Sequence, residues 1–218
     1  MVTKTLLMLI VVGSSYVSMA QTSGNGNVIS KTFDVKSFNK ISASGAYDVI
    51  LTQSAEQSVV IKVDENLMSR IEVKVVDGEL CLSSKSMQNP TKLIAEISMP
   101  ALKSIESSGA SDVKTTNKFS GSEIEIEASG ASEIYFTGDY AKMEINLSGA
   151  SDVTIVGKGN MLEADISGAS DLKASDYKVD NASIEASGAS DATVNVKGNL
   201  EMNESGASEI RNSQKSKK

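Results

Sequence analysis

The chain has 218 residues, with 28 acidic and 21 basic side chains, one Cys and no His. The net charge of −7 argues against a nucleic-acid-binding protein, because phosphate binding requires a surplus of Lys and Arg. The absence of His removes the most common general base and zinc ligand, and a single Cys cannot form an internal disulfide. Aromatic residues make up only 4% of the chain, so a packed core must consist mainly of aliphatic residues.

Residues 1–20 have the pattern of a secretory signal peptide. Lys4 supplies the positive start, an apolar run extends over residues 6–12, and a small-x-small cleavage site ends at Ala20. The apolar run is too short to span a bilayer, which requires about 20 residues. We therefore expect an exported protein that is periplasmic, at the cell surface or extracellular, and that does not span the membrane after cleavage. Residues 21–30 are predicted to be a flexible N-terminal segment.

The N-terminal half, residues 31–100, alternates apolar and polar residues with the period of strands. Strands are expected at 59–63 and 71–75, joined by a polar link with about one helical turn around 65–68. Asp77-Gly78 is a strong turn pair and predicts a hairpin.

The dominant feature of the sequence is a repeat of about 20 residues. The string Ser-Gly-Ala occurs seven times, and the last six copies continue with Ser and then Asp or Glu, at successive spacings of 21, 19, 19, 20 and 18 residues. The first interval, from Gly45 to Gly109, is 64 residues long. This is close to three periods, so the same coil is expected to continue through it. The repeated glycines are Gly45, Gly109, Gly130, Gly149, Gly168, Gly188 and Gly206.

Side chains in each copy alternate between apolar and polar on either side of the Gly. Met143, Ile145 and Leu147 share the phase of Gly149, whereas the opposite phase is polar. A unit of this size cannot bury its apolar face alone, so the copies must stack. We predict an all-β fold, a right-handed parallel β-helix (β-solenoid) with about 20 residues per coil, because the six-residue period of left-handed coils is absent.

The predicted solenoid is a single domain over residues 31–210, followed by a basic disordered tail at 211–218. Each repeated Gly is expected in the inward phase at a corner, where a side chain would crowd the core. The Ser two residues after each Gly is also expected to point inward and to bond the corner backbone. Tyr47 takes this place in the first copy.

Acidic residues recur at fixed offsets from the Gly and should form outward columns about 4.8 Å apart per coil. They are expected to form a solvated acidic face, and the alternative is a Ca²⁺ site along Asp112, Glu133, Asp152, Asp171, Asp191 and Glu209. The first column, three residues after the Gly, contains Asp48 and those six residues. The second column, three before, contains Glu106, Glu127, Asn146, Asp165, Glu185 and Asn203, and the third, five before, contains Glu125, Glu144, Glu163 and Glu201.

No catalytic residue, cofactor or firm metal ligand is predicted. A catalytic centre should interrupt the repeat at one place, whereas the carboxylates of the columns belong to repeating series. Cys81, between two Leu residues in a strand pattern, is expected to be a plain core or half-exposed thiol.

Several segments in order are similar to a known family. They are Ser-Gly-Ala-Tyr-Asp-Val at 44–49, Val-Asp-Glu-Asn-Leu at 63–67, Asp-Gly-Glu-Leu at 77–80 and Ile-Ser-Met-Pro-Ala-Leu at 97–102, followed by the tandem copies. This order resembles the head GIN domain family, described as auto-transporter adhesins and found as exported proteins of Bacteroidetes-like bacteria. The resemblance implies a right-handed β-helix-like fold.

The resemblance also implies a non-catalytic, adhesin-like protein that presents its repetitive acidic and Ser-rich face to a protein or glycan at the cell surface. Two alternatives stay open. One is a carbohydrate-active β-helix enzyme of the polysaccharide lyase or hydrolase kind. The other is a self-assembling structural rod, because the ends of a solenoid expose strand edges.

Overall fold

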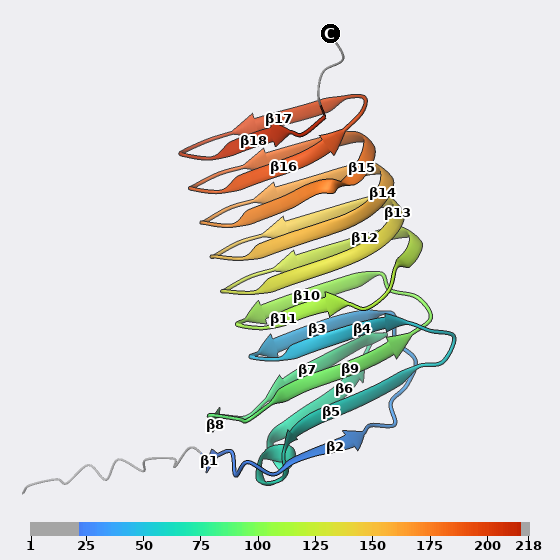
Figure 1. The fold of residues 1–218 in the computed structure, drawn as a ribbon, viewed down its shortest axis with the longest axis vertical. Coiled ribbons are helices and arrows are strands. Elements are labelled where there is room, and N and C mark those ends of the chain that lie inside the picture. Colours follow the sequence, from blue (N-terminus) through green and yellow to red (C-terminus); the bar gives the residue numbers. More distant parts are fainter. Residues whose placement is uncertain (1–21, 215–218) are drawn as a thin grey trace, which may run out of the picture.

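The structure, a computed structural model, describes residues 22–214. These residues form a stack of β-coils with one 3₁₀ helix near its N-terminal end (Figure 1). The predicted signal peptide at 1–20 lies outside the described residues.

The repeat region consists of strands that leave a sharp corner, bend, and return to the next corner. We call the part of each coil that follows a corner the outgoing strand and the part that precedes the next corner the returning strand. Neighbouring coils pair in parallel throughout this region, which confirms the predicted β-solenoid with coils of about 20 residues. Its strands are β10 (Ser104–Gly109), β11 (Asp112–Thr115), β12 (Phe119–Ala128), β13 (Glu133–Leu147), β14 (Asp152–Ile166), β15 (Asp171–Ala186), β16 (Asp191–Val196), β17 (Leu200–Glu204) and β18 (Glu209–Asn212).

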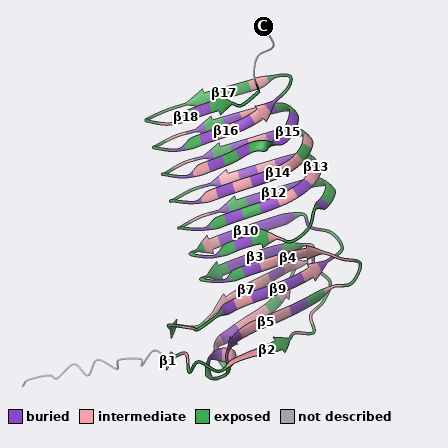
Figure 2. Ribbon diagram, viewed as in Figure 1, coloured by how far each residue is buried: buried purple, intermediate pink, exposed green. Residues whose placement is uncertain are grey.

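The core lies between the outgoing and returning strands. Met143, Ile145 and Leu147 are buried, as the alternation predicted, and Figure 2 shows buried and more exposed residues alternating along the coils. The same inward position stacks from coil to coil, for example Ile126 opposite Ile145, so each coil covers the apolar side chains of the next.

The corner glycines are exposed, not inward as the alternation suggested, and the crowding they avoid is between backbones. Gly149 has φ +78°, and a Cβ built on it would lie 2.6 Å from the carbonyl oxygen of Gly130 in the preceding corner. That oxygen accepts a hydrogen bond of 2.8 Å from the Ala150 N–H. Gly is therefore required both by the left-handed backbone and by the close stacking of corners.

The Ser two residues after the corner Gly points inward, and in several copies its hydroxyl group donates a hydrogen bond to a nearby backbone carbonyl. Ser151 Oγ donates to Ser148 O at 2.8 Å, and Ser190 Oγ donates to Ser187 O at 2.9 Å. Both inward serines are fully buried, so these bonds supply the partners that a buried hydroxyl needs. In the first copy the inward residue is Tyr47, which is also buried.

The first interval does not contain three further coils. β3 (Lys40–Gly45) pairs directly with β10 so that Gly45 lies opposite Gly109, and β4 (Asp48–Gln53) pairs with β11. The two corners are therefore neighbours in space, and the expectation of a continuous run of coils through this interval was wrong. The chain between β4 and β10 instead leaves the coil path and forms the N-terminal end of the stack (Figure 1).

The N-terminal end extends both faces of the solenoid by antiparallel pairing. β9 adds to β4 in parallel and β5 then pairs antiparallel with β9, while β7 adds to β3 and β6 pairs antiparallel with β7. The β6–β7 connection is the predicted hairpin, with positive φ at Asp77 and Gly78, and the expected helical turn is η1. These elements are β5 (Ser58–Asp64), η1 (Glu65–Arg70), β6 (Ile71–Val76), β7 (Glu79–Ser84), β8 (Met87–Gln88) and β9 (Leu93–Met99).

The described part of the segment expected to be flexible, residues 22–30, contributes to two strands. β1 (Thr22–Ser23) pairs with β8, and β2 (Val28–Thr32) pairs with β5. A buried carboxylate holds this segment in place: Asp64 accepts hydrogen bonds from the Gly26 N–H at 2.7 Å, the Thr91 N–H at 2.7 Å and the Thr91 hydroxyl at 2.8 Å.

Acid is expected to release this N-terminal segment before the rest of the solenoid. Burial raises the pKa of Asp64, but hydrogen bonds from Thr91 and Gly26 outweigh it and hold the pKa below its ordinary value of 3.8. A carboxylate with a depressed pKa stabilises the folded state above its unfolded-state pKa, and this contribution is lost as the pH falls through the folded-state pKa. Hydrogen exchange of residues 24–30, corrected for intrinsic rates, should therefore accelerate below about pH 4.

Two substitutions separate this local effect from general acid sensitivity. Asp64→Asn should accelerate exchange of residues 24–30 already at neutral pH, whereas Asp34→Asn, at an exposed site, should not. Exchange that does not change with pH in the unmodified protein would contradict the role assigned to Asp64.

The C-terminal coil extends into the predicted tail. Arg211 and Asn212 belong to β18, and the Asn212 side chain bonds the backbone of Val196 at 3.0 and 3.1 Å. Residues 215–218 lie outside the described part of the chain. No helix within residues 22–214 has the length and apolar character needed to cross a bilayer.

Candidate functional site

The acidic columns stack on two faces of the solenoid. The first column lies on the outgoing strands, where each member is the direct register partner of the next. The second lies on the returning strands and is in register along its whole length. The third also lies on the returning strands, but Ser183 separates Glu163 from Glu201. The sequence spacing therefore predicted the alignment of the side chains, but not that the columns divide between two faces.

Lysines on the same faces reduce the repulsion within the columns. Lys173 Nζ lies 3.0 Å from an oxygen of Asp152 and 4.0 Å from one of Asp171, so it bridges two coils of the first column. Lys142 Nζ lies 2.7 Å from Glu163 and 3.9 Å from Glu144. Hydrogen bonds to Asp152 and Glu163, respectively, raise the pKa values of Lys173 and Lys142.

The first column is the candidate for Ca²⁺ binding. Its members follow one another along the solenoid axis, one per coil. In the described residues, no group of three or more His, Cys, Asp or Glu side chains is placed to hold one metal ion. Asp152 and Asp171 instead share a lysine.

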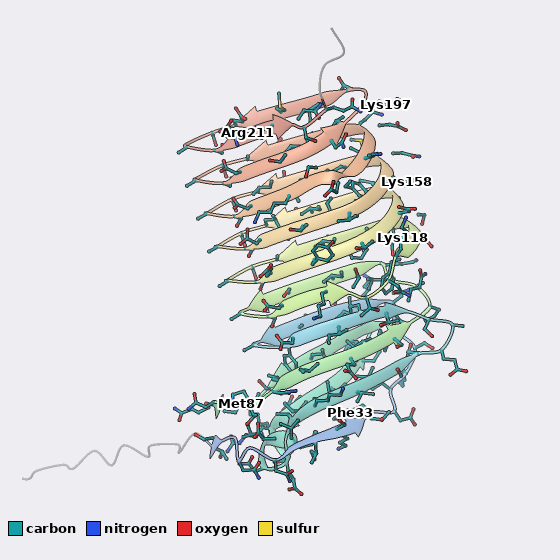
Figure 3. All side chains as sticks on the ribbon, in the orientation of Figure 1. Phe33, Met87, Lys118, Lys158, Lys197 and Arg211 are labelled. Atoms are coloured by element: carbon teal, nitrogen blue, oxygen red, sulfur yellow. The ribbon has the colours of Figure 1, made fainter. Side chains whose placement is uncertain are left out.

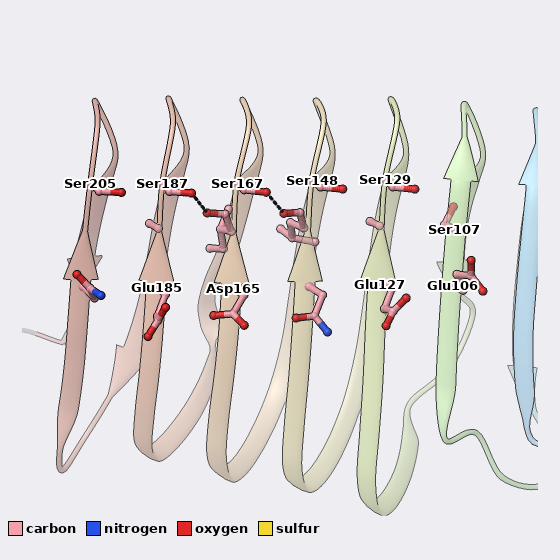
Figure 4. A pocket seen from close by; sticks show the side chains of 16 residues that line it. Glu106, Ser107, Glu127, Ser129, Ser148, Asp165, Ser167, Glu185, Ser187 and Ser205 are labelled. Atoms are coloured by element: carbon pink, nitrogen blue, oxygen red, sulfur yellow. Dashed lines mark hydrogen bonds between the residues drawn. The ribbon is translucent and has the colours of Figure 1, made fainter.

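Beside the corners, the returning strands form a groove of about 550 Å³, which we call the corner groove. Figure 4 shows its two rows of polar side chains running along the solenoid axis. One row is the second acidic column, and the other is a row of serines, five of which immediately precede a corner Gly, whereas Ser107 lies two residues before Gly109. Its polar lining residues are Glu106, Glu127, Asn146, Asp165, Glu185, Asn203, Ser107, Ser129, Ser148, Ser167, Ser187 and Ser205.

Two of the groove serines are anchored by the backbone of the preceding coil. Ser167 Oγ donates to Leu147 O at 3.1 Å, and Ser187 Oγ donates to Ile166 O at 3.5 Å (Figure 4). A hydroxyl that donates to the protein still has lone pairs with which to accept a bond from a ligand. Ser167 and Ser187 thus present oriented acceptors on neighbouring coils.

The carboxylates in the corner groove are close enough to influence one another. Burial raises the pKa of Glu127, and the neighbouring carboxylates of Glu125, Glu106 and Glu144 raise it further. The groove therefore favours ligand groups that donate hydrogen bonds or carry positive charge.

The corner groove was not predicted from the sequence. The offsets identified its acidic row, but the partner row depends on the Ser before five of the glycines lying on the same side of the corner. The sequence signal was the recurrence of this Ser in all seven Ser-Gly-Ala strings. Cys81 is half-buried, and burial raises the pKa of its thiol, as expected for an unreactive side chain.

Comparison with known proteins identifies the family. The family described as "Putative auto-transporter adhesin, head GIN domain" matches residues 37–215, most of the chain. The chain belongs to the head GIN domain family. The resemblance seen in the ordered segments and tandem copies is thereby confirmed, and the family description supports an adhesin-like role at the cell surface.

Solved structures similar to this GIN-domain protein share its fold. A "putative adhesin" from Bacteroides fragilis has a TM-score of 0.77 at 22% identity, covering 87% of this chain and 99% of that one. A "putative adhesin" from Parabacteroides merdae has a TM-score of 0.71 at 18% identity, covering 89% and 99%. A protein from Parabacteroides distasonis described as "putative lipid binding protein" has a TM-score of 0.72 at 17% identity, covering 89% and 100%. No curated protein matches the sequence.

Proposed function

We propose that this GIN-domain protein is an exported, non-catalytic adhesin-like module whose corner groove binds a glycan at a cell surface. The observation that carries the proposal is the groove itself, in which two parallel rows of polar groups repeat with the coil interval. A linear polymer of similar units can use the same contacts on successive coils, so weak individual bonds add along its length.

The chemistry of the two rows favours a neutral or cationic glycan. Carboxylates accept hydrogen bonds from sugar hydroxyls, and the amides of Asn146 and Asn203 both donate and accept. Anionic sugars would be repelled by the acidic row. The groove is bounded by strands on a rigid scaffold, which lowers the entropy lost on binding.

Replacing two groove carboxylates by amides is expected to weaken glycan binding about ten-fold to a hundred-fold. A bond to a charged acceptor contributes on the order of 1 kcal/mol more than a bond to a neutral amide oxygen, and two such differences add. Asp165→Asn combined with Glu185→Gln removes two register partners in the middle of the groove. A glycan array on the mature protein would select the ligand, and calorimetric titration would compare the variants.

The matched control removes the same number of carboxylates from the other face. Asp152→Asn with Asp171→Asn changes two register partners of the first column, on the outgoing strands, and should leave the affinity unchanged. An equal loss of glycan affinity in the two double variants would mean that overall charge, not the corner groove, determines binding.

A carbohydrate-active enzyme is the second candidate, and Glu127 is the observation in its favour. A general acid must hold its proton near neutral pH, and the pKa of this carboxyl is raised. Turnover of a polysaccharide that Glu127→Gln abolishes, with Glu125→Gln as the control, would replace the binding-module proposal by this one.

A further inference from the structure

A second groove lies along the bends, on the edge of the solenoid opposite the corners. We call it the bend groove; its volume is about 560 Å³. Figure 3 shows Lys158 and Lys197 on this edge, together with Lys118. The groove is lined by Asp139, Tyr140, Ala141, Lys158, Gly159, Asn160, Lys178, Val179, Asp180, Asn195, Lys197 and Gln214.

Three lysines of consecutive coils line the bend groove. Lys158 and Lys178 are direct register partners, and Lys178 pairs in turn with Asn195, two residues before Lys197. All three side chains are exposed. Within residues 22–214 their ammonium groups have no ion pair or hydrogen bond, unlike Lys142 and Lys173 in the acidic columns.

The acids of the bend groove do not cancel this positive charge. One oxygen of Asp139 lies 3.1 Å from Lys118 Nζ, and the other accepts a bond of 3.1 Å from the Lys158 backbone N–H. Asp180 is the other carboxylate that lines the groove. The three lysines that line the groove therefore exceed its two carboxylates in number.

The bend is closely packed at Gly159, which lines the groove. A Cβ at Gly159 would collide with the Tyr177 hydroxyl oxygen and the Tyr140 carbonyl oxygen, so the chain can make this bend only without a side chain there. Tyr177 Oη donates to Tyr140 O at 3.1 Å and so links β15 to β13 across the coil that contains Gly159. The lysines therefore extend from a rigid, concave surface.

We propose that the bend groove binds a linear acidic polysaccharide, with the carboxylates of successive sugars contacting Lys158, Lys178 and Lys197. The protein carries a net charge of −7, so a polyanion is repelled from the corner edge and attracted to this local surplus of lysine. Lysines on consecutive coils suit a polymer with regularly spaced charges better than a single small anion. A concave groove along the axis suits a chain better than the flat surface of a membrane.

The test measures binding of polygalacturonate to the full mature chain by biolayer interferometry at low and physiological salt. The triple variant Lys158→Gln, Lys178→Gln, Lys197→Gln should bind about ten-fold more weakly, because three exposed ion pairs are lost. Affinity of the unmodified protein should fall as salt rises. The matched control changes three exposed lysines elsewhere, Lys36, Lys92 and Lys103, to Gln and should leave binding unchanged.

The outcomes also separate this site from the corner groove. The corner variant with Asp165→Asn and Glu185→Gln should not weaken binding of polygalacturonate, so either site can fail without the other. Binding of vesicles of equal parts phosphatidylcholine and phosphatidylglycerol in place of polygalacturonate would overturn the proposal in favour of a membrane surface. Equal losses in the triple variant and its lysine control, or no binding of polygalacturonate, would also overturn it.

Discussion

Replacing Gly149 by Ala is expected to destabilise the protein by about 3 kcal/mol. An L-residue in the left-handed region costs about 1–2 kcal/mol, and at this corner the new Cβ would also lie 2.6 Å from the Gly130 carbonyl oxygen. Relieving that contact must stretch the hydrogen bond from Ala150 N–H to Gly130 O, now 2.8 Å long. Urea unfolding followed by circular dichroism would measure the loss in free energy of unfolding.

Gly78 offers a matched control for the backbone conformation alone. Its φ of +79° is nearly the same as that of Gly149, but a Cβ there would have no neighbour within 4 Å. Gly78→Ala should therefore cost only about 1–2 kcal/mol from backbone strain. If the two substitutions cost the same, close stacking of the corners is not what requires Gly.

Replacing Phe136 by Ala is expected to cost about 3–5 kcal/mol, the range for removing a large buried aromatic side chain. The Phe136 ring is completely buried, and its centroid lies 6.2 Å from that of Phe119 and 5.9 Å from that of Tyr140. Truncation leaves a cavity between coils whose backbones are fixed by the parallel ladder. The same urea titration, with the slope of the transition checked for constancy, would give the value.

The neighbouring aromatic residue is the control for this substitution. Tyr135 precedes Phe136 on the same strand but points outward and is 47% exposed. Tyr135→Ala should change the free energy of unfolding by no more than about 0.5 kcal/mol. A loss at Tyr135 comparable to that at Phe136 would contradict the assignment of inward and outward faces.

The two proposed binding sites use opposite edges of one scaffold. The corner groove presents carboxylates and serines. The bend groove presents lysines that form no ion pair within residues 22–214. Because both edges repeat with the coil, each can contact a polymer over several units. An adhesin-like protein of this kind could hold a neutral glycan and an acidic one at the same time, which a mixed-ligand binding assay would detect.

The repeat in the sequence predicted much of the coil and the acidic column that forms one row of the corner groove. Alternation around Gly149 gave the inward residues, because strand geometry fixes the face of each side chain once one position is known. The fixed offset from the Gly gave the register of the first column, such as Asp152 opposite Asp171. The same alternation misplaced the glycines, because the chain leaves the strand conformation at the corner, where φ is positive.

The path of the chain outside the repeat could not be predicted in this way. Gly45 and Gly109 are 64 residues apart in sequence and adjacent in space. The intervening chain leaves the coil because β5 pairs antiparallel with β9 and β6 pairs antiparallel with β7. Spacing along a sequence does not specify whether a strand pairs with the coil before it or folds back on its neighbour.

By itself, the sequence determined the strand period, the length of the coil and the alignment of the acidic columns, since all three follow from local alternation and a regular interval. Only the tertiary structure decided which columns share a face, how the N-terminal strands close the stack, and where the corner groove and the bend groove lie. These features depend on contacts between residues about one coil or more apart, and the direction in which the chain turns at each corner and bend determines them.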